Sequence, residues 1–211
     1  IDTSSGTSVA LIENGVVRAE HNVADTMKHA ELIGEAIQDV LAQAFVRPAQ
    51  IMAVVAGRGP APFTGLRVGI AAATMFAAGV GVKLYGAVSL DAIALAALPT
   101  LCVTKSEPLL VTTDARRKEV YWALYSGLDE FGVPIRIDGP GVMKPEELDD
   151  YLVNRNVHPV TTDIAVSAAN LGLLAEGQLR AGTIQEDTSA LYLRAADAVE
   201  PKARIGKAVS G

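Results

Sequence analysis

The residues best suited to binding an anion lie in one loop rich in glycine and proline, from Gly57 to Gly69. The loop follows the apolar run 51–56 and precedes a helical segment of small residues, expected from Leu66 to about residue 80. A strand, a stiff loop and the start of a helix bring free backbone N–H groups and the positive end of the helix dipole together. The loop has neither the Lys-Ser or Lys-Thr pair of a Walker loop nor the glycine spacing of a dinucleotide site. It predicts a specific anion-binding loop and leaves the ligand open.

Histidine, cysteine and paired carboxylates offer little further chemistry. His21, His29 and His158 do not have the spacing of paired metal ligands. The single cysteine, Cys102, is expected to be a small buried hydrophobe rather than a nucleophile. The acidic residues within 146–150 fall on a helix that we expect to be exposed, so we interpret them as solvated charge.

The composition indicates an ordinary globular protein of one large or two small domains. Of 211 residues, 50% are hydrophobic and 20% are charged, and the net charge of −6 argues against a large basic face for nucleic acid. No apolar run reaches membrane-spanning length, no signal peptide is evident, and one cysteine cannot form an internal disulfide. A cytoplasmic protein is therefore expected. The chain opens at Ile1-Asp2 without Met, as though the beginning of a first strand were missing.

The first half of the chain alternates strand and helix patterns. Asn14-Gly15 is a strong hairpin signal between two strand-like runs, and apolar residues at helical spacing follow up to Pro48. This order suits a mixed sheet with helices packed on it. The expected strands are 7–12, 16–23, 51–56 and 83–87, and the expected helices are 33–44, 66–80 and 89–97.

The second half begins after an expected inter-domain break at 99–108 and repeats the same general order. Both halves open with strands and continue with helices, which is compatible with a duplicated fold of two domains, 1–98 and 99–211. The expected strands are 109–113, 119–125, 133–137 and 190–194, and the expected helices are 145–154 and 165–181.

Five segments, met in order over nearly the whole chain, resemble the TsaB (YeaZ) family. They are Asp2-Thr-Ser-Ser5, the glycine-proline loop, Tyr85–Ala92, Asp114–Trp122 and Leu191–Arg194. The resemblance implies the actin-like (ASKHA, ribonuclease H-like) α/β fold, with two duplicated α/β domains that face a cleft. It also implies a role in making threonylcarbamoyladenosine at adenosine 37 of tRNAs that read codons starting with A. In that pathway the family acts beside its catalytic relative TsaD and the ATPase TsaE.

The resemblance also bears on metal and nucleotide binding. Where the catalytic relative carries a His-x-x-x-His metal site, this chain has Ser89 and Ile93, and isoleucine cannot ligate a metal. No metal site is therefore expected. A kinase-like fold has glycines where Arg116-Arg-Lys118 stand, which weakens the case for ATP hydrolysis by this chain. For Asp2 to Ser5, an Asx-type turn that closes a strand is an equal alternative to a phosphate contact. The candidate nucleotide or phosphate contacts are Asp2, Thr3, Ser4, Arg67, Asp114 and Arg116.

The resemblance further implies pairing through the first two helices of the N-terminal lobe, with a second copy when alone or preferentially with the catalytic subunit. The candidate partner-binding residues are Met27, Ile33, Ile37, Leu41, Met75 and Phe76. The leading hypothesis is a non-catalytic scaffold that has no cofactor of its own and meets ATP or ADP only at the partner interface. We expect it to contact tRNA only indirectly, through the complex, and not to bind a membrane. The alternatives are a metal-dependent, glycoprotease-like peptidase and an ATP-binding phosphotransferase of the same fold.

Overall fold

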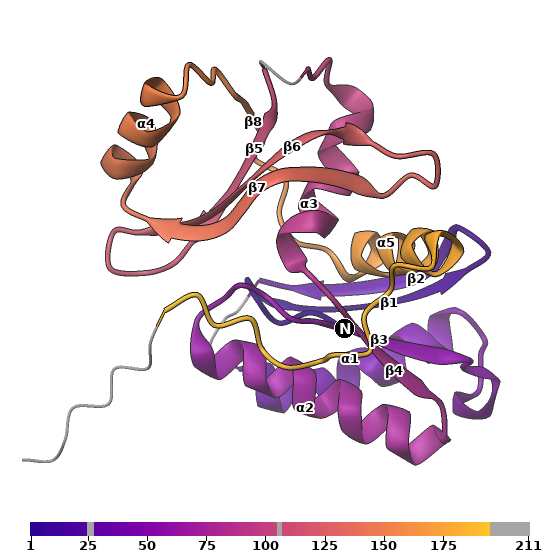
Figure 1. Cartoon of the computed structure of the whole chain (residues 1–211). Helices are drawn as coiled ribbons and strands as arrows, with labels where there is room; N and C mark the ends of the chain where they lie inside the picture. Colours follow the sequence, from indigo (N-terminus) through magenta and orange to yellow (C-terminus); the bar gives the residue numbers. More distant parts are fainter. Residues whose placement is uncertain (25–27, 105–106, 195–211) are drawn as a thin grey trace, which may run out of the picture.

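Two α/β lobes make up the structure, a computed structural model that describes residues 1–24, 28–104 and 107–194 (Figure 1). Strands and helices alternate nearly as the sequence predicts. The first half holds β1 (Thr7–Glu13), β2 (Val16–Val23), α1 (His29–Gln43), β3 (Ala53–Gly57), α2 (Phe63–Val80), β4 (Lys83–Ala87) and α3 (Ser89–Ala97). The second half holds β5 (Leu109–Asp114), β6 (Val120–Leu128), β7 (Pro134–Met143), α4 (Pro145–Asn154), β8 (Val160–Thr161) and α5 (Ala168–Ala181).

The C-terminal lobe is built on one sheet with the strand order β7-β6-β5-β8. β5, β6 and β7 form an antiparallel meander, and β8 lies parallel to β5 after the crossover through α4. Both faces of the inner strand β5 are covered, so Leu109, Leu110 and Val111 are all buried. The continuous apolar run is typical of such a doubly covered strand.

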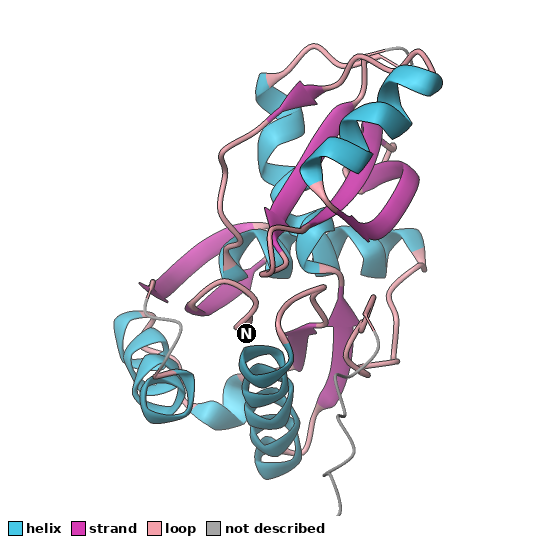
Figure 2. Ribbon diagram, turned by 90° about the vertical axis from the view of Figure 1, so that its left-hand side faces the viewer, coloured by secondary structure: helices cyan, strands magenta, loops and turns pink. Residues whose placement is uncertain are grey.

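The N-terminal lobe holds two separate two-stranded sheets, β1-β2 and β3-β4. The hairpin turns at Asn14 and Gly15, whose φ values of 52° and 76° lie in the left-handed region that a tight hairpin turn requires. β3 and β4 are parallel and are joined by α2. The amino terminus lies between the two sheets (Figure 2), where Ile1 pairs with β3 and Asp2 pairs with β1.

Helices α1 and α2 pack on this lobe through small and branched side chains. α1 buries Ile33, Ala36 and Val40 against Val9 of β1. α2 buries small residues such as Ala73 against β3, which lets the helix approach the strands closely.

α2 begins three residues earlier than Leu66, because Pro62 occupies its N-cap position and Phe63 already belongs to the helix.

Over the 18 residues of α2 the mean hydropathy is 1.5, and 22% of that stretch is buried. By length and composition alone it is apolar enough to cross a membrane, contrary to the expectation from the sequence. A single helix of this kind is weak evidence for a membrane span, because core helices of globular proteins have the same composition.

Each lobe is completed by a helix from the other half of the chain. α3 packs on the C-terminal sheet, where Leu90 and Ile93 join the core that includes β5 and β6. α5 lies across the N-terminal lobe, against β1 and β3 and beside α3 (Figure 1). Gly172 of α5 is needed there, since a Cβ atom would lie 2.4 Å from the Ile12 side chain. Packing therefore crosses the boundary that we predicted between residues 98 and 99.

Two local predictions are wrong. Residues 190–194 do not form a strand; instead, residues 183–194 run as an extended segment, here called the C-terminal strap, with one isolated bridge between Gln185 and Gly86. Cys102 is exposed rather than buried, because it lies in the connection between α3 and β5 instead of inside an element.

Candidate functional site

The glycines of the 57–69 loop make room for the start of the chain. A Cβ atom on Gly57 would lie 1.9 Å from Oδ2 of Asp2, and one on Gly69 would lie 2.2 Å from Oγ1 of Thr3. The Thr3 hydroxyl donates a hydrogen bond of 2.7 Å to the carbonyl of Gly65, in the first turn of α2. The loop thus packs tightly against protein where we expected an anion.

The carboxylate of Asp2 is buried and bonded within the protein. Only 2% of the residue is exposed. Oδ1 accepts hydrogen bonds from the backbone N–H and the hydroxyl of Ser4, and Oδ2 accepts one of 2.6 Å from the Ser89 hydroxyl. The same Ser89 hydroxyl accepts a bond from the N–H of Gly59. The bonds to Ser4 form an Asx-type turn, and the bond to Ser89 connects it to the N-terminus of α3.

The two positions compared with a metal-binding histidine pair serve packing in this chain. Ser89 is buried in the network around Asp2, and Ile93 is buried in the core of the C-terminal lobe. Within the described ranges, no group of three or more His, Cys, Asp or Glu side chains is placed to hold a metal ion. The residues present therefore do not fit a metal site at this place.

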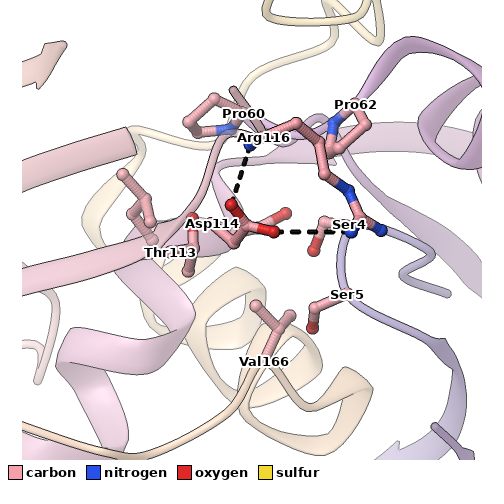
Figure 3. A pocket seen from close by; sticks show the side chains of 10 residues that line it. Ser4, Ser5, Pro60, Pro62, Thr113, Asp114, Arg116 and Val166 are labelled. Carbon is pink, nitrogen blue, oxygen red and sulfur yellow. Dashed lines mark hydrogen bonds and ion pairs between the residues drawn. The ribbon is translucent and has the colours of Figure 1, made fainter. Parts of the chain in front are cut away.

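A cavity of about 170 Å³ lies between the lobes, and three of the predicted phosphate contacts meet there. Figure 3 shows Ser4 on one wall and Asp114 with Arg116 on another. The Arg116 backbone N–H donates to Oδ1 of Asp114 at 2.8 Å, and its guanidinium lies 3.6 Å from Oδ2. This ion pair brings no net charge to the cavity, and Asp2 and Thr3 are not part of its lining.

The turn after Asp114 has a glycine-like backbone without glycines. Arg116, Arg117 and Lys118 have φ values of 61°, 55° and 61°, in the left-handed region that glycine favours. The side chains occupy space that glycines would leave open for a phosphate.

Arg67 lies away from the cavity, against the C-terminal strap. Its Nε donates to the Tyr192 hydroxyl at 2.7 Å, and its guanidinium stands 5.6 Å from the Tyr192 ring centre and 5.8 Å from that of Phe63. Arg58 fastens the strap further along, with bonds of 2.9 Å to the Ser189 carbonyl and 2.6 Å to Asp187. Sequence reasoning missed this strap because its contacts join segments far apart in the chain.

The predicted partner-binding residues do not share one surface. Met75 is 72% exposed on α2. Ile33 is buried in the core of the lobe and is not available to a partner, which corrects the prediction for this residue. Ile37, Leu41 and Phe76 are half-buried and line a groove behind the helices. Met27 lies outside the described residues.

The outward faces of α1 and α2 combine small side chains with polar and charged ones, among them Glu31 and Glu35 of α1. A Cβ atom added to Gly34 or Gly79 would meet nothing within 4 Å. Small residues let a further helix approach closely. We refer to this surface as the α1–α2 face; its exposed residues are Ala30, Glu31, Gly34, Glu35, Gln38, Ala42 and Gln43 of α1 and Thr64, Arg67, Ala71, Thr74, Met75, Ala78 and Gly79 of α2.

Sequence reasoning also missed a buried polar group that fastens α3 to the C-terminal sheet. The Tyr125 hydroxyl donates to Oδ1 of Asp91 at 2.6 Å, and the Arg136 guanidinium lies 3.7 Å from the same oxygen. Burial raises the pKa of Asp91 above its ordinary value, although Arg136 and the bond from Tyr125 act in the opposite direction. The contact is structural, since it lies inside the lobe.

Known proteins match most of the chain. Residues 23–166 match the family model of TsaD, tRNA N6-adenosine threonylcarbamoyltransferase. An uncharacterized protein of Mycobacterium leprae is 37% identical over 152 residues, which cover 68% of this chain and 38% of that protein. The tRNA threonylcarbamoyladenosine biosynthesis protein TsaB of Escherichia coli is 35% identical over 147 residues, 69% of this chain and 62% of that protein. The chain thus matches less than two thirds of the length of these relatives.

Solved structures are similar over both lobes. YeaZ from Pseudomonas aeruginosa superposes with a TM-score of 0.74 at 25% identity, covering 91% of this chain and 97% of that one. Another P. aeruginosa protein, described as uncharacterized with similarity to peptidase YEAZ, has a TM-score of 0.75 at 26% identity, with coverages of 92% and 97%.

Proposed function

Because the chain belongs to the TsaB (YeaZ) family and has its actin-like α/β fold, we propose that it takes part in tRNA threonylcarbamoyladenosine biosynthesis as a non-catalytic subunit. Its role is to bind a TsaD-like catalytic subunit, and a second copy of itself when that subunit is absent. The observation that carries this proposal is the exposed α1–α2 face on the N-terminal lobe.

The α1–α2 face has the properties of a helix-docking surface. The 18 residues of α2 have a mean hydropathy of 1.5, yet only 22% of this stretch is buried within the chain. Met75 projects from small neighbours and is flexible enough to fill an irregular pocket on a partner. Burying such a face against partner helices would remove apolar surface from water and is therefore favourable.

A catalytic role for the chain alone has little support from its residues. Ser89 and Ile93 are committed to packing where the catalytic relative has metal ligands, which counts against a peptidase. The cavity between the lobes, at about 170 Å³, is small beside ligand sites of roughly 300 Å³ or more, which counts against an ATP-dependent phosphotransferase. We therefore place ATP or ADP only at the partner interface. A TsaE-like ATPase would join the complex, and the chain would contact tRNA only indirectly, through that complex. We expect the complex to work in the cytoplasm.

The test is binding of this chain to a purified TsaD-like subunit, measured by calorimetry and gel filtration. Met75→Arg should weaken binding at least tenfold, because an arginine would have to be buried in an apolar contact. Val153→Arg is the matched control, since Val153 is 70% exposed on α4 of the other lobe. Equal effects of the two variants, or none from Met75→Arg, would place the contact elsewhere.

The non-catalytic part of the proposal has its own assay. The purified chain is incubated with tRNA and threonylcarbamoyl-adenylate, and modified adenosine is measured. We expect no product without the TsaD-like subunit. Product formed by the chain alone would show that it is the enzyme.

A further inference from the structure

Arg67 is the only lysine or arginine in helices α1 and α2. It is exposed and lies in one stripe along α2 with Ala71, Thr74 and Ala78, which have helical spacing from it and are exposed as well. Met75 lies next to this stripe. Arg67 therefore forms one end of the α1–α2 face that we propose as the docking surface.

Two aromatic rings and a hydroxyl hold the guanidinium of Arg67 in place. Its Cζ atom stands 5.8 Å from the ring centre of Phe63 and 5.6 Å from that of Tyr192, and the two ring centres are 4.6 Å apart. Its Nε donates to the Tyr192 hydroxyl at 2.7 Å. The strap is fixed beside it, since the N–H of Leu191 donates to the carbonyl of Arg58 at 2.8 Å. The guanidinium is thus oriented before a partner arrives, which lowers the entropy cost of using it in binding.

The charge of Arg67 has no opposite charge beside it in the described ranges 1–24, 28–104 and 107–194. There, Arg58, Arg136 and Arg155 lie 2.6, 3.7 and 2.9 Å from a carboxylate oxygen, and Arg67 lies within ion-pair distance of none. Its Nη1 and Nη2 groups have no hydrogen-bond acceptor in these ranges either. The two groups form a planar fork of N–H donors, which a carboxylate accepts with both of its oxygens.

The charges of the α1–α2 face favour a single carboxylate over the phosphates of a nucleic acid. Surfaces that bind nucleic acid gather several cations, because the backbone carries a charge at every nucleotide. The α1–α2 face has one cation, Arg67, and two carboxylates, Glu31 and Glu35, so its net charge is negative. One carboxylate on a protein helix needs only one such cation.

We propose that Arg67, held by Phe63 and Tyr192, pairs with a carboxylate on a docking helix of the TsaD-like subunit and thereby determines which partner the α1–α2 face accepts. This inference rests on the function proposed above. Docking removes water from the open side of the guanidinium, and a buried guanidinium without an acceptor is costly. A partner helix that fits the small side chains but lacks the carboxylate is therefore rejected. Tyr192 is a positioning residue that acts through Arg67.

The test measures the dissociation constant of the complex with a purified TsaD-like subunit, by calorimetry at low and high salt. Arg67→Ala should weaken binding about tenfold and Arg67→Glu about a hundredfold. Arg67→Lys should recover only part of the loss, because an ammonium group lacks the planar fork. High salt should weaken the parent complex more than the Arg67→Ala complex, because only the parent has the ion pair.

Arg180→Glu is the matched control. It changes the net charge of the chain as Arg67→Glu does, and Arg180 is exposed on α5. Figure 1 shows α5 on the opposite side of the N-terminal strands from α1 and α2. Its affinity should stay within about twofold of the parent.

Two further variants separate the contact from its support. Tyr192→Phe keeps the ring but removes the acceptor of the Nε bond, so it should weaken binding about threefold in the parent and not at all in the Arg67→Ala background. Replacing the acidic residues on the partner's docking helices by lysine, one at a time, should identify one that improves the binding of Arg67→Glu at least about tenfold.

The proposal and the function on which it rests fail in different ways. If Met75→Arg weakens binding while Arg67→Ala and Arg67→Glu do not, the docking surface stands and the ion pair is wrong. If the parent chain does not bind the TsaD-like subunit, the proposed function is wrong as well. Equal losses from Arg67→Glu and Arg180→Glu would reduce the effect to net charge.

Two other results would give Arg67 a different ligand and overturn the proposal. A loss of self-association in Arg67→Ala, with the complex unchanged, would assign the carboxylate to a second copy of this chain. A loss that appears only when tRNA is present would assign Arg67 to a phosphate.

Discussion

Replacing Gly57 by alanine tests whether the glycine-proline loop is built around the carboxylate of Asp2. The new Cβ atom would lie 1.9 Å from Oδ2 and 2.7 Å from Cγ of Asp2, far inside contact distance. The backbone cannot withdraw freely, since the N–H of Gly57 bonds to the carbonyl of Ile1. The carboxylate must therefore move and weaken its bonds to Ser4 and Ser89.

The expected cost follows from two contributions. Overpacking a buried site costs about 1–3 kcal/mol, and poorer bonding of a buried charged group costs about 1.5–3 kcal/mol. Relaxation reduces both, so we expect the free energy of unfolding to fall by about 3 kcal/mol. For a chain of this length, that corresponds to a fall in melting temperature of about 6–12 °C.

The assay is urea unfolding followed by circular dichroism, in the parent and in an Asp2→Ala background. Without the carboxylate, Gly57→Ala should cost at least about 1 kcal/mol less, which is the signature of two residues in contact. Gly34→Ala is the control, because its Cβ atom meets nothing and alanine favours α1 by up to about 1 kcal/mol. If Gly57→Ala cost the same in both backgrounds, the loop would not be shaped by Asp2.

Three further predictions concern the rest of the molecule. Because burial raises the pKa of Asp91 above 3.8, the native chain keeps this proton at a pH where the unfolded chain has lost it. The contribution of Asp91 to the free energy of unfolding therefore becomes more unfavourable as pH rises from 3.8 through the raised pKa. In urea melts at stepped pH, the stability of Asp91→Asn should increase relative to the parent over that range. A difference between the two that does not change with pH would refute this. Arg58→Ala removes the bonds to Ser189 and Asp187, so chymotrypsin should cut at Tyr192 about tenfold faster, while an unchanged rate would mean that other contacts hold the strap. Lys118→Gly should stabilise the chain by about 0.5–1 kcal/mol in urea melts, because glycine adopts the left-handed φ of this position without strain, and that gain exceeds the entropy cost of glycine. A loss of stability would show that the Lys118 side chain is needed.

Local patterns in the sequence predicted most of the strands and helices. Asn14-Gly15 has few alternatives to a tight hairpin, and the apolar run at 109–111 had to be covered on both faces. α2 was predicted to start too late, because Phe63 and Thr64 carry no helix signal of their own and the helix begins directly after Pro62. The strap was mistaken for a strand, since its apolar residues pack against side chains rather than pair with a neighbouring strand.

The candidate site was harder to predict because its contacts are long-range. The glycines at 57, 65 and 69 were interpreted as part of an anion-binding loop, and only the structure shows that they make room for Asp2 and Thr3. Helical spacing placed Ile33 and Met75 on helix faces without saying which face meets the sheet. Ser4, Asp114 and Arg116 were brought together by the fold, whereas Arg67 was drawn to Tyr192.

The exchange of α3 and α5 between the lobes has a consequence for dissecting the protein. A fragment ending at residue 98 would carry α3 without the β5 and β6 side chains that bury Leu90 and Ile93, and its own sheet would lack α5. The complementary fragment would have the reverse deficits. Neither half forms an autonomous folding unit, so the chain should unfold in a single transition, and fragments 1–98 and 99–211 should become structured only when mixed, each completing the other's core.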